Sequence, residues 1–138
     1  MAEELVAGAV YTAVVVEALN RTHLAQYAAA SGDYHPVHHD DTYAQSIGYP
    51  SVFAHGMLTM GLTGSFLERT VGRGSLTHYT ARLVGQVWPG DRLTATLKVT
   101  GIVDGIAELE VQTVNQDGAV VLTGSAGACT QDPFVDVQ

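Results

Sequence analysis

The sequence predicts a single α+β domain in which an antiparallel β-sheet curls around one central α-helix. Residues 55–70 form a segment of helical length that is almost wholly apolar through Leu67. After Ser75 apolar and polar residues alternate, as they do in half-buried strands. The pairs Asp104-Gly105 and Asp117-Gly118 are hairpin-turn signals between such strands. Together these observations favour about four late antiparallel strands preceded by one buried helix.

The N-terminal part adds one strand and one short helix to this plan. Residues 9–16 are β-branched and apolar, which is typical of a strand. Asn20-Arg21-Thr22 is a helix-start signal, and Gly32 is suited to the left-handed residue that ends a helix. We therefore expect a helix that stops immediately before Asp33.

A second short helix is expected at about residues 42–47. Either Asp40 or Asp41 can cap its first turn, and Gly48 follows its end. The segment between the two short helices then becomes a loop, which presents side chains without a helical register.

The long helix at residues 55–70 is expected to be buried on all sides. Its apolar residues are distributed around the axis instead of forming one stripe. Gly56, Gly61 and Gly64 each cost up to about 1 kcal/mol relative to Ala inside a helix. Close approach of a surrounding sheet would explain why they are present.

Length and composition limit the function classes. The chain has 138 residues, which suits one domain spanning residues 1–138. Its charged fraction of 14% is below the roughly 25% of an average domain, so we expect a subunit interface. A net charge of −8 with scattered basic residues argues against nucleic acid binding, although local arginines can still hold an anionic ligand.

Cys129 is the only cysteine, so no internal disulfide forms, and we expect it to pack as a small apolar residue. No apolar run approaches a membrane span and the start of the chain is acidic, so we expect a cytoplasmic protein that binds no membrane.

The segment 31–40, Ser-Gly-Asp-Tyr-His-Pro-Val-His-His-Asp, carries the chemistry of this chain. Asp33 and His38 are five residues apart, a spacing that does not stack side chains on one helix face. Pro36 fixes its own φ and forces the residue before it to be extended, so a tight turn can bring the two side chains together. A carboxylate beside an imidazole can hold a water and exchange protons near neutral pH.

Structural explanations compete with this interpretation. Asp33 alone can cap the following turn, and His38 alone can be a hydrogen-bonded loop histidine. His35, His38 and His39 also lie among three aspartates, but no known metal-ligand spacing is present, so we expect no bound metal. His35 and His39 are expected either at the surface or next to Asp33 and His38 in a supporting position. From there, either histidine can form a hydrogen bond with Asp33 or His38.

The chain resembles the MaoC-like family of (R)-specific enoyl-thioester hydratases, also called hydratase 2. The family motif is matched by Tyr27, Ser31, Gly32, Asp33, His35, Pro36, Val37, His38 and Asp40, followed by the run Ala54-His55-Gly56-Met57-Leu58. The resemblance is sharp over about residues 27–60. Two positions depart: His35 stands where the family usually has Asn, and Asp41 where it often has Pro.

The resemblance implies a hot-dog fold and a reversible hydration of trans-2-enoyl thioesters to (R)-3-hydroxyacyl thioesters. It implies that Asp33 and His38 are the catalytic side chains and that the Gly56 amide faces the thioester carbonyl. The substrate would be a coenzyme A or acyl-carrier-protein thioester, and no cofactor is implied. We expect Tyr34, His55 and Met57 to contact the substrate, with His55 more a helix-capping or packing residue than a third acid/base.

Two other functions remain open. A non-catalytic hot-dog subunit would bind the thioester and shape the pocket of a catalytic partner, although such a subunit is expected to lose the acid/base pair. A hot-dog thioesterase would hydrolyse the thioester instead of hydrating its double bond. An open sheet edge favours dimerisation, either with a second copy or with another hot-dog subunit.

Overall fold

The computed structural model describes residues 4–131. The elements in chain order are β1 (Val10–Val16), α1 (Arg21–Ser31), the 3₁₀ turn η1 (Pro36–His38), α2 (Asp41–Ser46), α3 (Gly56–Val71), β2 (Leu76–Leu83), β3 (Leu93–Val103), β4 (Ile106–Val114) and β5 (Val120–Cys129). Within these described residues, no helix is long and apolar enough to cross a membrane.

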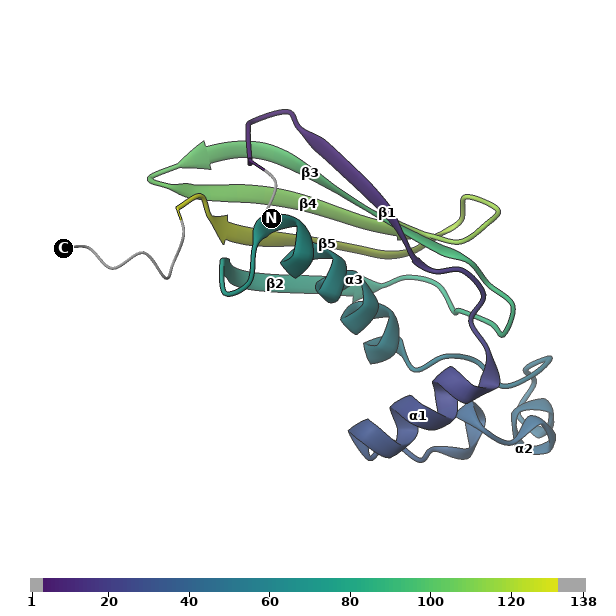
Figure 1. Ribbon diagram of the computed structural model, residues 1–138. Coiled ribbons are helices and arrows are strands. Elements are labelled where there is room, and N and C mark those ends of the chain that lie inside the picture. Colours follow the sequence, from purple (N-terminus) through teal and green to yellow (C-terminus); the bar gives the residue numbers. More distant parts are fainter. Residues whose placement is uncertain (1–3, 132–138) are drawn as a thin grey trace.

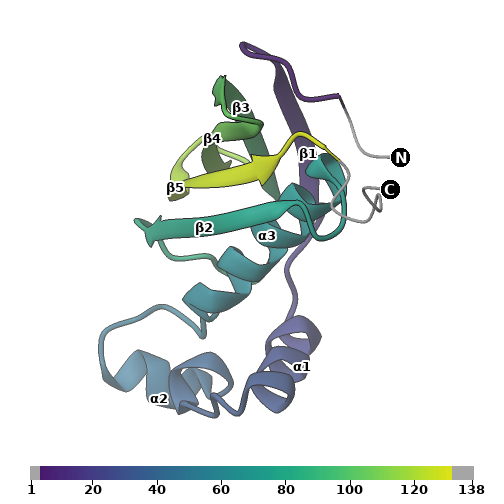
Figure 2. The same ribbon diagram turned by 90° about the vertical axis from the view of Figure 1, so that its left-hand side faces the viewer.

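The five strands form one antiparallel sheet in the order β1-β3-β4-β5-β2. The sheet curls over α3, which lies along its concave face (Figures 1 and 2). This arrangement confirms the predicted α+β hot-dog architecture. The helices α1 and α2 lie beyond the N-terminal end of α3, away from the sheet (Figure 1).

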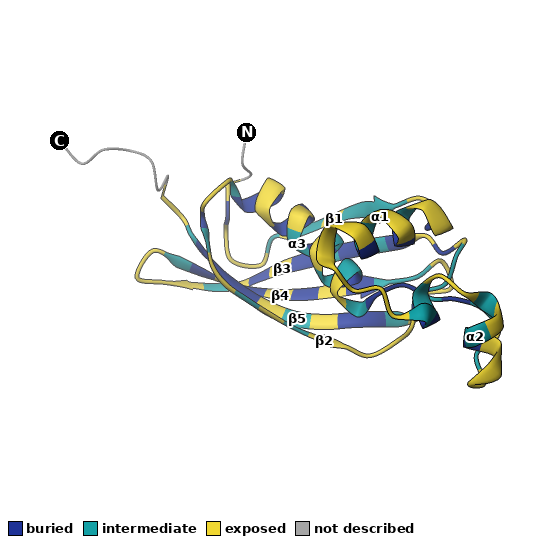
Figure 3. Cartoon of the chain, turned by 90° about the horizontal axis from the view of Figure 1, so that it is seen from below, coloured by how far each residue is buried: buried dark blue, intermediate teal, exposed yellow. Residues whose placement is uncertain are grey.

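The main core lies between α3 and the sheet. Buried residues alternate along β3 and β4 because every second side chain of a strand points toward the helix. Figure 3 shows these buried positions along the strands that α3 covers. The core includes Phe66, Leu67, Leu97, Val99, Leu109, Val111 and Leu122. This packing fixes α3, and therefore its N-terminus, relative to the sheet.

The prediction that α3 is buried on all sides is wrong for the single chain. Its buried residues lie on one face: Thr59, Thr63, Phe66, Leu67, Thr70 and Val71. Met57 is 57% exposed, and Gly61 and Ser65 are also exposed. The sheet curls over one side of the helix only, so within residues 4–131 the sheet leaves the opposite side uncovered.

The glycines of α3 have different surroundings. A Cβ added at Gly64 would lie 3.2 Å from the Tyr79 ring of β2, so close approach by the sheet is confirmed there. Gly56 lies against the Leu83 side chain at the end of β2. A Cβ at Gly61 would meet nothing within 4 Å, so the same explanation is wrong at that position.

The hairpin and helix ends follow the expected turn chemistry. Asp104 and Gly105 have φ values of 52° and 76° and join β3 to β4 as a tight turn. Asn20 caps α1 by accepting from the His23 amide, and Gly32 ends it in the left-handed region with φ 75°. Asp40, not Asp41, caps α2 by accepting from the Tyr43 amide over 3.1 Å.

A second hydrophobic cluster holds the segment between α1 and α3 against the end of the sheet. We call it the loop core. It comprises Leu19, Leu24, Val37, Ala44, Val52, Ala54, Val87, Leu93 and Val121. Asp41 reinforces this region: it accepts from the Val52 amide over 3.0 Å and from the Arg21 guanidinium over 2.7 Å. The Val52 hydrogen bond, followed by the one from Arg21, lowers the pKa of Asp41.

Candidate active site

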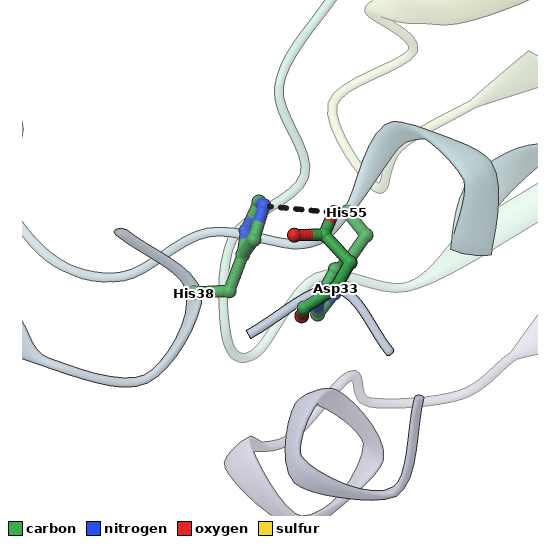
Figure 4. Close-up of side chains that lie close together, drawn as sticks. All are labelled: Asp33, His38 and His55. Atoms are coloured by element: carbon green, nitrogen blue, oxygen red, sulfur yellow. Dashed lines mark hydrogen bonds and ion pairs between the residues drawn. The ribbon is translucent and has the colours of Figure 1, made fainter. Parts of the chain in front are cut away.

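The side chains of Asp33 and His38 converge, as the sequence predicted. Oδ2 of Asp33 lies 3.9 Å from Nε2 of His38 (Figure 4). Gly32 turns the chain at the end of α1, and Pro36 opens the single 3₁₀ turn that carries His38. The separation is too long for a direct hydrogen bond and is suited to a bridging water.

The orientation of His38 is fixed by the backbone of Phe53. Nδ1 of His38 lies 2.7 Å from the Phe53 carbonyl oxygen. A carbonyl oxygen only accepts, so Nδ1 carries the proton, and in the neutral ring Nε2 carries the free lone pair. The neighbouring Val37 side chain is buried in the loop core and anchors the turn. The lone pair of His38 is thereby directed toward the Asp33 carboxylate.

The environment of His38 favours its neutral form. Burial lowers its pKa below the ordinary value of 6.5, and the imidazoles of His55 and His35 act in the same direction. The Phe53 hydrogen bond and the Asp33 carboxylate oppose this shift. The result is an imidazole that is uncharged at neutral pH and able to accept a proton.

Asp33 also stabilises the turn that follows α1. Its Oδ1 accepts a hydrogen bond from the His35 amide over 3.3 Å, so the predicted turn-capping role is confirmed. Its side chain is 52% exposed, and Oδ2 remains directed toward His38. One carboxylate oxygen therefore orders the turn while the other faces the imidazole.

His35 fills the position where the family usually has Asn. Its Nδ1 accepts from the Val37 amide over 3.2 Å and caps the 3₁₀ turn. Nδ1 of histidine and Oδ1 of asparagine are the same number of bonds from Cα, so the imidazole supplies an equivalent acceptor. The ring also lies edge-on to that of His38, with centroids 6.2 Å apart.

His55 lies directly against the pair. Its ring is 2% exposed and stacks on the ring of His38, with centroids 3.8 Å apart and planes at 24°. Its Nε2–H donates to the backbone carbonyl of Asp33 over 3.0 Å. It makes no side-chain cap on α3, so the packing role predicted for it is confirmed and the capping role is wrong. Only its buried Nδ1, which has no hydrogen-bond partner among the described residues, is left for any contact with a substrate.

Asp33, His38 and His55 are also a group of potential metal ligands, with candidate ligand atoms within 4.8 Å of one another. A metal ion lies in the plane of each imidazole that binds it. The two rings here are stacked, so their in-plane lone pairs run side by side instead of meeting at one point. Joint binding of one ion by this group would therefore require one ring to turn.

The N-terminus of α3 lies beside a hollow of about 500 Å³. The side chain of the N-cap residue His55 makes no capping hydrogen bond here, and the first amide groups of the helix carry the positive end of its dipole. The hollow is lined by Phe53, Ala54, Gly56, Thr59, Leu83, Val84, Gly85, Gln86 and Val87. Phe53 borders it and also packs edge-on against His38, with ring centroids 5.3 Å apart. The ring of Phe53 thus lies between this hollow and His38, and neither Asp33 nor His38 is among the residues that line it.

A second, mainly apolar hollow of about 370 Å³ lies between α1, β1 and α3. Tyr27 lines it together with Leu19. The same Tyr27 ring packs edge-on against His55, with centroids 4.8 Å apart. Leu58 and Leu62 line the hollow from α3.

Some predicted site residues lie at the margin. Tyr34 is 63% exposed and Met57 57% exposed, and each follows a residue of the site in sequence. Nε2 of His39 donates to the Tyr34 carbonyl over 3.1 Å and has no hydrogen bond to Asp33 or His38. Sequence reasoning missed Phe53, because a backbone carbonyl carries no residue-specific signal.

The fold and the site together define a class: a hot-dog protein with an Asp/His pair beside the amino end of its central helix. Residues 5–120 match the family model described as "MaoC like domain". The chain therefore belongs to the MaoC-like dehydratase family.

Two relatives by sequence have different sizes. The (R)-specific enoyl-CoA hydratase of Aeromonas caviae is 32% identical over 109 residues, covering 75% of this chain and 80% of that protein. The fatty acid synthase beta subunit TOXC of Cochliobolus carbonum is 32% identical over 104 residues, covering 72% of this chain. The chain spans only 5% of the length of that fungal subunit.

Solved structures agree with the family assignment. The (R)-hydratase of Aeromonas caviae superposes with a TM-score of 0.81 at 28% identity, over 91% of this chain and 97% of that one. The R-hydratase PhaJ1 of Pseudomonas aeruginosa superposes with a TM-score of 0.80 at 28% identity, over 98% of this chain and 91% of that one.

Proposed function

We propose that the protein reversibly hydrates trans-2-enoyl thioesters to (R)-3-hydroxyacyl thioesters, as a hydro-lyase of fatty acid metabolism. The observation that carries this proposal is the 3.9 Å approach of Asp33 Oδ2 to His38 Nε2. The enoyl thioester substrate and the (R) configuration are inferred from the similarity to the (R)-specific enoyl-CoA hydratase of Aeromonas caviae.

In the hydration direction a water lies between the two side chains. Nε2 of His38 removes one proton while the carboxylate of Asp33 accepts the other hydrogen of the water and orients it. The water oxygen bonds to C3, and the π electrons move toward the thioester oxygen. The proton held by His38 is then delivered to C2, so that one water has been added and both side chains are restored.

The negative charge that develops on the thioester oxygen needs a donor. We assign this role to the Gly56 amide, because Gly56 opens α3, borders the hollow, and directly follows His55, which contacts both Asp33 and His38. Tyr34 and Met57 are proposed to contact the thioester at the exposed margin of the site. Coenzyme A and acyl carrier protein both remain candidates for the thioester carrier, and no cofactor takes part in these steps.

Crotonyl-coenzyme A tests the reaction directly. Loss of the enoyl absorbance without release of free thiol supports the hydratase. Release of free thiol would support a thioesterase. If neither the absorbance nor the thiol concentration changes, the result would support a non-catalytic thioester-binding subunit. Chiral analysis of the 3-hydroxybutyryl product tests the (R) configuration.

Asp33→Asn and His38→Gln test the residue roles. Each is expected to lower kcat by about 10²–10⁴-fold, the usual contribution of a positioned acid or base. His78→Gln is the matched control, because it removes an exposed imidazole on β2 and is expected to keep wild-type turnover. Wild-type turnover in both Asp33→Asn and His38→Gln would refute the assignment.

We further propose that the protein acts as a homodimer or as a heterodimer with another hot-dog subunit. One face of α3 is exposed, and β1 and β2 are the two edge strands of the sheet. Open edges and exposed apolar residues such as Met57, Leu83 and Val84 are typical of surfaces that another subunit covers. Sedimentation equilibrium of the purified chain tests this, and a monomer at micromolar concentration would exclude the homodimer.

A further inference from the structure

We propose that His55 is a positioning residue that holds both members of the acid/base pair, an inference that rests on the proposed hydratase function. It contacts Asp33 through a hydrogen bond and His38 through its ring face. Figure 4 shows the three side chains close together. The buried side chain of His55 therefore contacts both Asp33 and His38, the two residues of the proposed acid/base pair.

The first contact fixes the backbone of Asp33. Nε2–H of His55 donates to the Asp33 carbonyl oxygen over 3.0 Å, and the two residues are 22 positions apart in sequence. The bond ties the turn after α1 to the residue that precedes α3. The Cα of Asp33, and therefore the starting point of its carboxylate, is held relative to the Gly56 amide.

The second contact fixes the plane of the His38 ring. One face of this ring lies on His55 at a centroid distance of 3.8 Å, and the ring of Phe53 meets it edge-on at 5.3 Å. The hydrogen bond from Nδ1 to the Phe53 carbonyl defines the third constraint. Rotation of the imidazole, which would turn Nε2 away from Asp33, would break the stack as well as this bond.

The ring of His55 is itself held in place by packing. Its imidazole also lowers the free energy of unfolding relative to an apolar ring, because one of its nitrogens is buried without a hydrogen bond within residues 4–131. Its ring is 2% exposed and packs against the edge of Tyr27. Its Nδ1 is buried without a partner among the described residues, and such an atom opposes folding by its lost hydration. A residue that only filled space here would be better as phenylalanine, so the imidazole is explained by what its other nitrogen holds.

The stack also disfavours a charge on His38. The ionisable groups that face His38 are His55, Asp33 and His35. The two imidazoles lower the pKa of His38, in the same direction as burial, whereas the carboxylate raises it. Removal of His55 would therefore make His38 easier to protonate, in addition to freeing its ring.

Two variants separate the two contacts. His55→Gln keeps an N–H donor at the same number of bonds from Cα as Nε2, so it can retain the bond to Asp33 but not the stack. His55→Phe keeps a planar ring against His38 but leaves the Asp33 carbonyl without its donor. Circular dichroism and thermal unfolding establish that each variant is folded before its activity is compared, and His78→Gln again controls for loss of an imidazole.

We expect kcat for crotonyl-coenzyme A to fall in both variants by up to about 100-fold, because a displacement of about 1 Å in a reacting group has that effect. KM is expected to stay close to wild type. The midpoint of the His38 ring titration, followed by NMR in the absence of substrate, is expected to move to higher pH in both variants. This shift reports the contact between the two rings, whereas a lower kcat at an unchanged KM reports the positioning.

Three outcomes would overturn the proposal. Unchanged kcat and an unchanged His38 titration in a folded His55→Gln variant would show that His55 positions nothing. A raised KM with unchanged kcat would show that it contacts the substrate instead. An unshifted His38 titration in both variants would remove the proposed contact with His38 even if activity fell. The NMR titration needs no turnover, so it stays informative if the wild-type protein proves not to be a hydratase, a result that would refute the proposed function separately.

Discussion

The backbone carbonyl of Phe53 accepts a hydrogen bond from Nδ1 of His38 over 2.7 Å. This bond assigns the ring proton to Nδ1 and leaves the lone pair on Nε2, 3.9 Å from the Asp33 carboxylate. Nε2 is therefore the nitrogen of His38 that can accept a proton.

The pH dependence of hydration should reflect the lowered pKa of His38. Only the neutral ring can remove a proton from water, and burial holds its pKa below 6.5. The expected kcat/KM for crotonyl-coenzyme A is constant from neutral pH to below 6.5 and then falls as acid protonates Nε2. An acid limb centred above pH 6.5 would contradict the buried, neutral His38 that the structure shows.

Stability should fall with acidification in the same interval. The unfolded chain binds a proton at His38 near pH 6.5, whereas the folded chain binds it only at lower pH. Between these two pKa values the unfolded state holds more protons, so the free energy of unfolding decreases as pH falls and becomes constant below the folded pKa. Asp41, with a pKa lowered from 3.8, contributes only at more acidic pH. Urea unfolding between pH 7.5 and 5 measures the effect, and the His38→Gln variant should show a smaller slope than wild type.

Asparagine should replace His35 with little loss of stability. The Nδ1 of His35 accepts from the Val37 amide over 3.2 Å, and asparagine places an acceptor oxygen at the same distance along the side chain. His35→Ala removes the acceptor and should lower the free energy of unfolding by about 1 kcal/mol, the usual value of an N-cap. Chemical denaturation compares the two variants. Equal losses in His35→Asn and His35→Ala would show that the cap is not what His35 contributes.

The hydroxyls of Thr63 and Thr113 form a buried pair between α3 and β4, with 2.7 Å between their oxygens. Thr63→Val removes one partner and leaves the other hydroxyl buried and unpaired, so we expect a loss of about 1–3 kcal/mol. The double variant Thr63→Val/Thr113→Val removes both hydroxyls and should recover most of this loss. A double variant that is less stable than the sum of the single variants would contradict the pairing.

The sequence by itself determined the type and order of the elements. Alternation along residues 93–100 specifies a strand whatever its partners are, because successive side chains point to opposite faces. Helix caps and turns are equally local: Asn20, Gly32 and the pair Asp104-Gly105 act on backbone groups within a few residues. The motif around Asp33 and His38 likewise predicted that these two side chains meet, because the turn at Pro36 brings them together.

The tertiary structure alone decided how that pair is held. Phe53 and His55 contact His38 from 15 and 17 positions further along the chain, through a backbone oxygen and a ring face that no local pattern encodes. The exposed face of α3 is a similar case: its apolar composition predicted burial, but the sheet of one chain curls over only one side. Such contacts depend on where distant segments meet in space, which is set by packing of the whole core and not by the spacing of residues in sequence.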